Sequence, residues 1–278
     1  MNNVLKPRWL VEMVAVWGYV QRNYFLTKRY FMWEVVWLVY VTVNAMAITY
    51  IGAGASHFGA GLDAEGFMTY LLVGALLWNY LSMLFDVLSE TVSWERWEGT
   101  IEYTFMSPSS RVTHLLGMGF YAVVYGILQT VVTLGVCVAF FELDLREANY
   151  WGALLVLAVC SVSLVGFGIV AAVLPLLSPE KGQQVSYIVS SLLLLVSGVY
   201  YEVDVLPRWM QAIATVSPVT YALEGARAAL LDGAGISELW GSIRVLLIMG
   251  VVFIPLGLYV FHLGERYAKK TGKLKRSG

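Results

Sequence analysis

Charged residues are scarce in this chain of 278 residues: 13% are Asp, Glu, Lys or Arg, whereas 59% are hydrophobic. A soluble domain carries about 25% charged residues. A soluble protein of this composition would expose much apolar surface and associate through it. The shortage of charge therefore predicts an integral membrane protein.

Cysteine and histidine are also rare, which excludes several kinds of chemistry. Cys137 and Cys160 lie within apolar runs, and we expect them to pack there rather than form a disulfide. The three histidines lack a second ligand at metal-binding spacing, so no metal site is predicted. No nucleophile–base pair stands at usable spacing, so we expect no catalytic residue. The net charge of −1 argues against nucleic acid as a partner.

The chain also lacks a phosphate-binding loop of the form G-x-x-x-x-G-K-[ST]. Its nearest approach, Gly272-Lys273, has neither the first glycine nor the final hydroxyl residue. We therefore expect the chain to bind neither ATP through that loop nor any other cofactor.

Long apolar segments are what the sequence does contain. A helix needs about 20 mainly apolar residues to cross a bilayer. Six segments qualify, and they predict an all-α membrane protein with six transmembrane helices at roughly 31–52, 67–88, 112–141, 150–176, 184–201 and 240–263.

Basic residues are concentrated at the two ends of the chain. Residues 1–30 and 264–278 hold 11 of the 18 Lys and Arg residues. In the first segment Met13, Trp17, Val20 and Tyr24 share one helical face, which predicts an amphipathic helix on the membrane surface, with a solvated helical tail as the alternative.

The distribution of basic residues also predicts the orientation of the chain. With six spans both termini lie on one side, which then holds 14 Lys and Arg residues against three on the other. The positive-inside rule places both termini and the 89–111 loop in the cytoplasm. The prediction is a multi-pass protein of the cytoplasmic (inner) membrane, with 264–278 as a basic cytoplasmic tail.

Ionisable residues within the spans are few, and Glu34, Asp86 and Arg244 lie near span ends. An ion-coupled carrier usually needs a carboxylate or broken helix near the midplane, so this class is disfavoured. Uncharged polar residues occur deeper. We regard four of them as candidates for a substrate path, with interhelical packing as the alternative: Tyr40, Asn44, Asn79 and Tyr80.

The stretch 93–108 is the most charge-dense part of the chain between its two ends. At about 100° per residue, Trp94, Trp97, Ile101 and Phe105 fall on one arc of a helix, and three glutamates fall beside them. This pattern predicts a short amphipathic helix over 94–107. Periodicity alone leaves open whether the helix holds two spans apart or docks a partner.

A second unusual stretch, 204–232, is too apolar for an ordinary loop. We expect two short helices that dip into the outer leaflet and return. Pro207 suits the first turn of one helix, and Ser217 is expected to cap a second that begins at Pro218.

These two stretches carry a resemblance. Glu95-Arg96-Trp97-Glu98-Gly99-Thr100-Ile101-Glu102, followed by Ser107-Pro108, resembles the coupling-helix signature of ATP-binding-cassette permeases of the type-2 exporter family. Leu206–Gln211 and Ser217–Glu224 resemble that family's outer re-entrant helices. The resemblance covers essentially the whole chain, although Ser217 stands where the family often has Asn.

The resemblance implies a homodimer, or a pair of similar permeases, in contact with membrane lipids. Two cytoplasmic nucleotide-binding subunits would bind ATP and Mg and dock on the coupling helix. The implied docking residues are Trp94, Glu95, Arg96, Trp97, Glu98, Gly99, Thr100, Ile101, Glu102 and Phe105. The implied residues of the outer gate are Pro207, Trp209, Pro218, Tyr221, Glu224 and Arg227.

The function that this resemblance implies is ATP-driven export. We favour a lipophilic, drug-like or lipid-linked substrate. A polysaccharide exporter is the alternative, since the aromatic content of 14% would also suit sugar stacking. An ion-coupled secondary transporter is the less favoured third reading.

Overall fold

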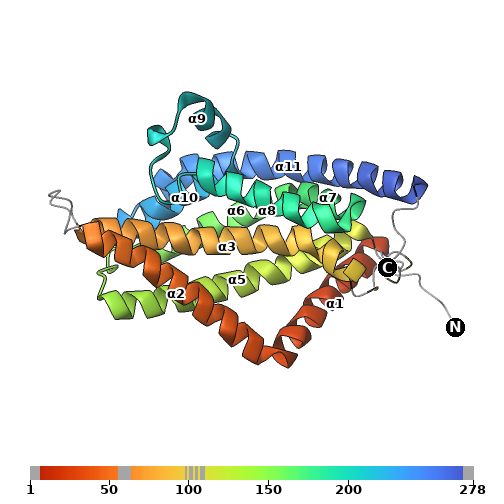
Figure 1. The fold of residues 1–278 in the computed structure, drawn as a ribbon, viewed down its shortest axis with the longest axis horizontal. Coiled ribbons are helices and arrows are strands. Elements are labelled where there is room, and N and C mark those ends of the chain that lie inside the picture. Colours follow the sequence, from red (N-terminus) through yellow and green to blue (C-terminus); the bar gives the residue numbers. More distant parts are fainter. Residues whose placement is uncertain are drawn as a thin grey trace.

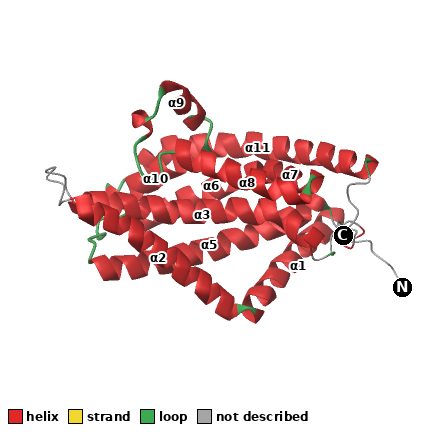
Figure 2. Cartoon of the chain, viewed as in Figure 1, coloured by secondary structure: helices red, strands yellow, loops and turns green. Residues whose placement is uncertain are grey.

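The computed structural model describes residues 7–55, 64–97, 99, 103, 106 and 110–271. Regular structure in these residues is helical throughout (Figure 2), so the prediction of an all-helical chain is confirmed for the part that is described. The helices are α1 (Arg8–Arg29), α2 (Phe31–Ala55), α3 (Ala64–Trp97), α5 (Arg111–Phe141), α6 (Tyr150–Ala171), α7 (Val173–Leu177), α8 (Pro179–Val196), the 3-10 turn η2 (Val203–Val205), α9 (Arg208–Ala214), α10 (Pro218–Leu231) and α11 (Ile236–Lys270).

Five stretches are long and apolar enough to cross a membrane: Phe31–Gly54, Glu65–Leu88, Val112–Phe141, Tyr150–Leu177 and Ile236–Lys270. The fourth is shared between α6 and the single turn of α7. The apolar part of α8, Gln184–Val196, is shorter. The chain is therefore a multi-pass membrane protein, as its composition predicts.

Apolar side chains cover the outside of the molecule. In the most apolar stretch of each helix, only 17% of the residues are buried in α2, 17% in α5 and 22% in α11. Surfaces of this kind would drive association in water, whereas lipid accommodates them.

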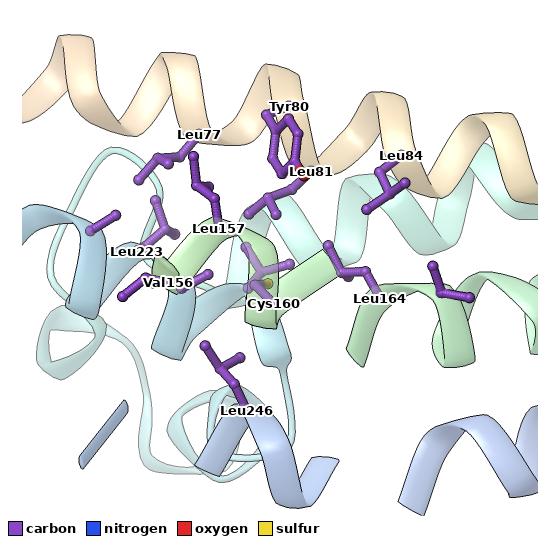
Figure 3. Close-up of a cluster of buried hydrophobic side chains, with 14 of the residues drawn as sticks. Leu77, Tyr80, Leu81, Leu84, Val156, Leu157, Cys160, Leu164, Leu223 and Leu246 are labelled. Carbon is purple, nitrogen blue, oxygen red and sulfur yellow. The ribbon is translucent and has the colours of Figure 1, made fainter. Parts of the chain in front are cut away.

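The long helices lie side by side in an elongated bundle (Figure 1). Helix α3 contacts α2, α5, α6, α8 and α10, while α11 packs along α6. Figure 3 shows the centre of the bundle, where side chains of α3, α6, α10 and α11 meet. Its members include Leu77, Tyr80, Leu81, Leu84, Val156, Leu157, Cys160, Leu164, Leu223 and Leu246. Cys160 and Cys137 are both buried and both free.

Two glycines allow α6 and α11 to approach closely. A Cβ atom on Gly166 would lie 2.5 Å from the backbone nitrogen of Ile254. A Cβ atom on Gly257 would lie 2.5 Å from the carbonyl oxygen of Gly166. Small residues at such crossings are how membrane helices gain van der Waals contact without a hydrophobic driving force.

Helix α1 packs on the first half of α5 through polar contacts. The carboxylate of Glu12 accepts hydrogen bonds from the backbone N–H of Ser110, at 3.2 Å, and from the hydroxyl of Thr113. The face that periodicity assigns to lipid stays exposed, with Met13 at 63% and Trp17 at 57%. This arrangement suits a helix that lies on a membrane surface.

Candidate functional site

A cavity of about 900 Å³ lies among α1, α2, α3 and α5. Three of the four predicted path residues line it: Tyr40 on α2, and Asn79 and Tyr80 on α3. Gln129 and Tyr125 of α5 line it as well. Helix packing thus gathers polar residues that are far apart in the sequence around one space of the size that small-molecule sites have.

The four path residues differ in their surroundings. Tyr80 is 2% exposed, and its hydroxyl lies 2.5 Å from Oγ of Ser161 on α6, so it contributes to the core as well as to the cavity wall. Asn44 is outside the cavity lining; its side-chain amide donates to the Tyr40 carbonyl oxygen at 2.9 Å. Tyr40 is 58% exposed.

Glu34 has a larger part in the cavity than its sequence position suggests. The hydroxyl of Tyr125 donates a hydrogen bond to Oε2 of Glu34 at 2.5 Å, and both residues line the cavity. Sequence reasoning places Glu34 at a span end, where a charge is inexpensive. The sequence feature that could have indicated this role is a row of aromatic residues at one-turn spacing beside Glu34, namely Trp33, Trp37 and Tyr40.

The C-terminal end of α3 is held within the chain by Glu95. This carboxylate is 5% exposed, and its Oε1 lies 3.2 Å from Nε2 of His114 and 3.5 Å from Nη1 of Arg22. The resemblance predicts that Glu95 faces the ATPase. The structure instead turns it toward α1 and α5, because those helices supply the polar groups that a buried carboxylate needs.

The predicted helix over 94–107 is corrected at its start. Residues 94–97 form the last turn of α3, and Gly99 has a φ of 74°, which interrupts any single helix over that range. Glycine adopts this left-handed conformation without steric cost and commonly ends helices. Beyond it, Tyr103 and Met106 are helical and exposed.

The other predicted docking residues are described only in part. The side chains of Trp94, Arg96 and Trp97 lie outside the described residues. So do the following residues as a whole: Glu98, Thr100, Ile101, Glu102 and Phe105.

The predicted outer helices correspond to α9 and α10, which differ in burial. On α9, Trp209 is 63% exposed, and the preceding Pro207 is exposed as well. Helix α10 packs against α3, α6 and α11 and places Pro218 and Ala226 in the interior. Of these two helices, α9 is the one that protrudes from the bundle (Figure 1).

The predicted cap by Ser217 is wrong. Ser217 occupies the N-cap position of α10 but makes no side-chain capping bond. Its hydroxyl lies 2.8 Å from that of Ser197 at the end of α8, and the two pair with each other. Ser217 therefore links α8 to α10. Tyr221, in the first turn of α10, donates to the Thr215 carbonyl oxygen at 3.0 Å and so ties α10 to the end of α9.

Arg227 fastens the turn after α8 to α3. Its guanidinium donates to the carbonyl oxygens of Gly198, at 2.9 Å, and Val199, at 2.5 Å, and lies 3.7 Å from the ring centre of Tyr70. Burial lowers the pKa of Arg227 from its ordinary value, while Tyr70 and Glu202 act in the opposite direction. Gly74 provides the space, since a Cβ atom there would lie 2.1 Å from the Val199 oxygen.

Replacing Arg227 with alanine should destabilise the end of the bundle where α10, α3 and the turn after α8 meet. The change leaves two carbonyl oxygens without their charged donor, which costs roughly 2 kcal/mol. The measurement is the melting temperature of the detergent-purified chain. Glu224→Ala, one turn earlier and exposed, is the matched control and should melt near wild type. Equal melting temperatures for the two variants would refute the role given to Arg227.

Among the described residues, no group of three or more His, Cys, Asp or Glu side chains is placed to hold a metal ion.

Comparison with known proteins identifies a family and two relatives of this chain. A family described as "ABC-2 type transporter" matches residues 16–231. Over 161 residues the chain is 30% identical to the daunorubicin resistance ABC transporter permease protein DrrB1 of Streptomyces coeruleorubidus, covering 56% of this chain and 54% of that protein. Over 64 residues it is 31% identical to the linearmycin resistance permease protein LnrN of Bacillus subtilis (strain 168), covering 23% and 17%. The chain therefore spans about half the length of the first relative and about a sixth of the second.

Proposed function

Because this chain belongs to the ABC-2 type transporter family, we propose that it is the membrane subunit of an ATP-driven exporter of lipophilic or drug-like molecules. The cavity among α1, α2, α3 and α5 is the observation that carries the choice of cargo. Its walls combine aromatic and aliphatic residues with polar groups, and small-molecule sites are lined by both kinds. The two relatives, whose names concern resistance to linearmycin and daunorubicin, support the same cargo class.

The proposed topology has six spans, with α8 as the fifth crossing. Its 18 residues are about 27 Å long at 1.5 Å per residue, close to the bilayer's hydrocarbon thickness. In Figure 1, α8 lies along the bundle beside α3, which supports a crossing. Both termini then face the cytoplasm, and the chain resides in the cytoplasmic membrane.

The energy in this proposal comes from partner subunits. Two ATPase subunits bind ATP and Mg and dock on the cytoplasmic segment that follows Trp97, in a complex with two copies of this chain. Closure of the ATPases moves this segment, and the spans move with it as rigid bodies. The chain contributes the substrate path and no catalytic group.

Co-expression of the chain with its ATPase tests the proposal. We expect a purified complex with two copies of each subunit by native mass spectrometry. In inverted vesicles it should accumulate a lipophilic fluorescent dye only when ATP is added. The control is vesicles with the chain alone, which should not concentrate the dye under ATP or an imposed ion gradient. Uptake by the chain alone under an ion gradient would contradict the proposal and favour a secondary carrier.

A further inference from the structure

Among the described residues, the lining of the cavity has more acidic than basic side chains. Its described ionisable side chains other than tyrosine are three carboxylates, Glu34, Asp86 and Glu95, and one guanidinium, Arg22. Arg22 lies 3.5 Å from Glu95, so the cation is already matched to one carboxylate. The hydrogen-bond donor to Glu34 is the neutral hydroxyl of Tyr125. Glu34 therefore presents its carboxylate to the cavity with a phenol hydroxyl, rather than a cation, as its hydrogen-bond donor.

Aromatic side chains stand on both sides of Glu34. On α2, Trp33 and Trp37 are in edge contact with ring centres 6.4 Å apart, and Trp37 and Tyr40 are 5.5 Å apart. On α5, Tyr121 and Tyr125 are stacked with ring centres 6.0 Å apart and an interplanar angle of 12°. All five rings line the cavity. Aromatic faces attract cations, and a nearby carboxylate adds to that attraction.

A separate observation indicates that the cavity takes a polar ligand. Thr133 of α5 lines it and is 0% exposed, yet its hydroxyl has no hydrogen-bond partner among the described residues. A buried hydroxyl without a partner is costly, so such groups usually meet a ligand or ordered water.

From these features we propose that the cavity binds amphipathic organic cations with one positive centre, and that Glu34 is their counter-ion. The aromatic rows of α2 and α5 hold the apolar body of the molecule. A matched anion would meet the same rings but would be repelled by the carboxylate of Glu34. This inference rests on the proposed function, because it names the class of cargo for the same cavity.

The test compares two ions of nearly equal size and shape, tetraphenylphosphonium and tetraphenylborate. Binding to the purified chain in a non-ionic maltoside detergent is measured by equilibrium dialysis, without the ATPase. Wild type should bind the cation more tightly. Glu34→Gln removes the charge but keeps a hydrogen-bond acceptor for Tyr125, and should weaken cation binding about tenfold, as expected for a lost counter-ion at a partly buried site. Binding of the anion should stay the same or tighten.

Three further variants separate a loss of the site from a loss of folding. Glu34→Asp retains the charge and should retain the preference for the cation. Trp37→Leu, at a side chain 45% exposed, should weaken cation binding with little effect on monodispersity. Glu147→Gln, in the exposed turn before α6, is the matched control for the loss of one negative charge.

The outcomes separate this inference from the proposed function. Unchanged cation affinity in Glu34→Gln, or equal losses for cation and anion, would overturn the inference even if ATP-driven transport is observed. Selective cation binding by a chain that never associates with an ATPase would uphold the site and count against the exporter.

Discussion

Introducing valine at Gly166 should abolish the accumulation of folded protein. The new Cβ would lie 2.5 Å from the backbone nitrogen of Ile254 and 2.5 Å from the carbonyl carbon of Phe253. Backbone atoms within a helix cannot move aside as a flexible side chain can, so α6 and α11 must separate. We expect a cost of about 3 kcal/mol or more, at the upper end of overpacking effects. The readout is the yield of monodisperse chain from membranes by size-exclusion chromatography.

Gly135→Val is the matched control for that change. A Cβ atom on Gly135, within α5, meets nothing within 4 Å. The same substitution there should give a yield near wild type. Similar yields from the two variants would show that the approach of α6 to α11 is not required for folding.

Reversing the charges of Glu98 and Glu102 should remove the ATPase from the complex. Both residues follow the end of α3, in the proposed docking segment outside the described residues. We expect these glutamates to pair with basic residues of the ATPase. Glu98→Lys with Glu102→Lys places like charges opposite those residues, and such pairs cost several kcal/mol across an interface. Co-purification of a tagged chain should lose the ATPase, while the chain itself remains monodisperse.

The control for this double variant changes the same number of charges elsewhere. Asp144→Lys with Glu147→Lys alters the exposed turn between α5 and α6, which lies on the outer side in the proposed topology. ATPase should still co-purify with it. Retention of the ATPase by the Glu98/Glu102 variant would remove this segment from the docking interface.

The class of the protein could be predicted from the sequence because composition and length report it directly. The shortage of charge and the long apolar runs predict a helical membrane protein, and the described helices agree. The resemblance carried by Glu95–Glu102 and Ser217–Glu224 is confirmed by the family match over residues 16–231. These signals are local or compositional and do not depend on which helices are neighbours.

Predictions that depend on neighbouring helices were less complete. Periodicity places Glu95 on one arc of a helix but does not reveal that His114 and Arg22 lie within reach of it. Ser217 is suited to capping, yet the hydroxyl of Ser197 is close enough to pair with it instead. Glu34 is at a span end in the sequence, and only the packing of α2 against α3 and α5 places it in the lining of a cavity.

Helix α3 has a mechanical consequence for the proposed transporter. Its 34 residues form one continuous helix about 50 Å long at 1.5 Å per residue. Near one end of α3, Tyr70 contacts Arg227 and Gly74 lies against the carbonyl of Val199. At the other end, Glu95 contacts residues of α1 and α5. No loop divides the two ends, so in the proposed transporter α3 would act as a lever. A displacement applied beyond Trp97 would be transmitted to the turn after α8 by the tilt of this one helix.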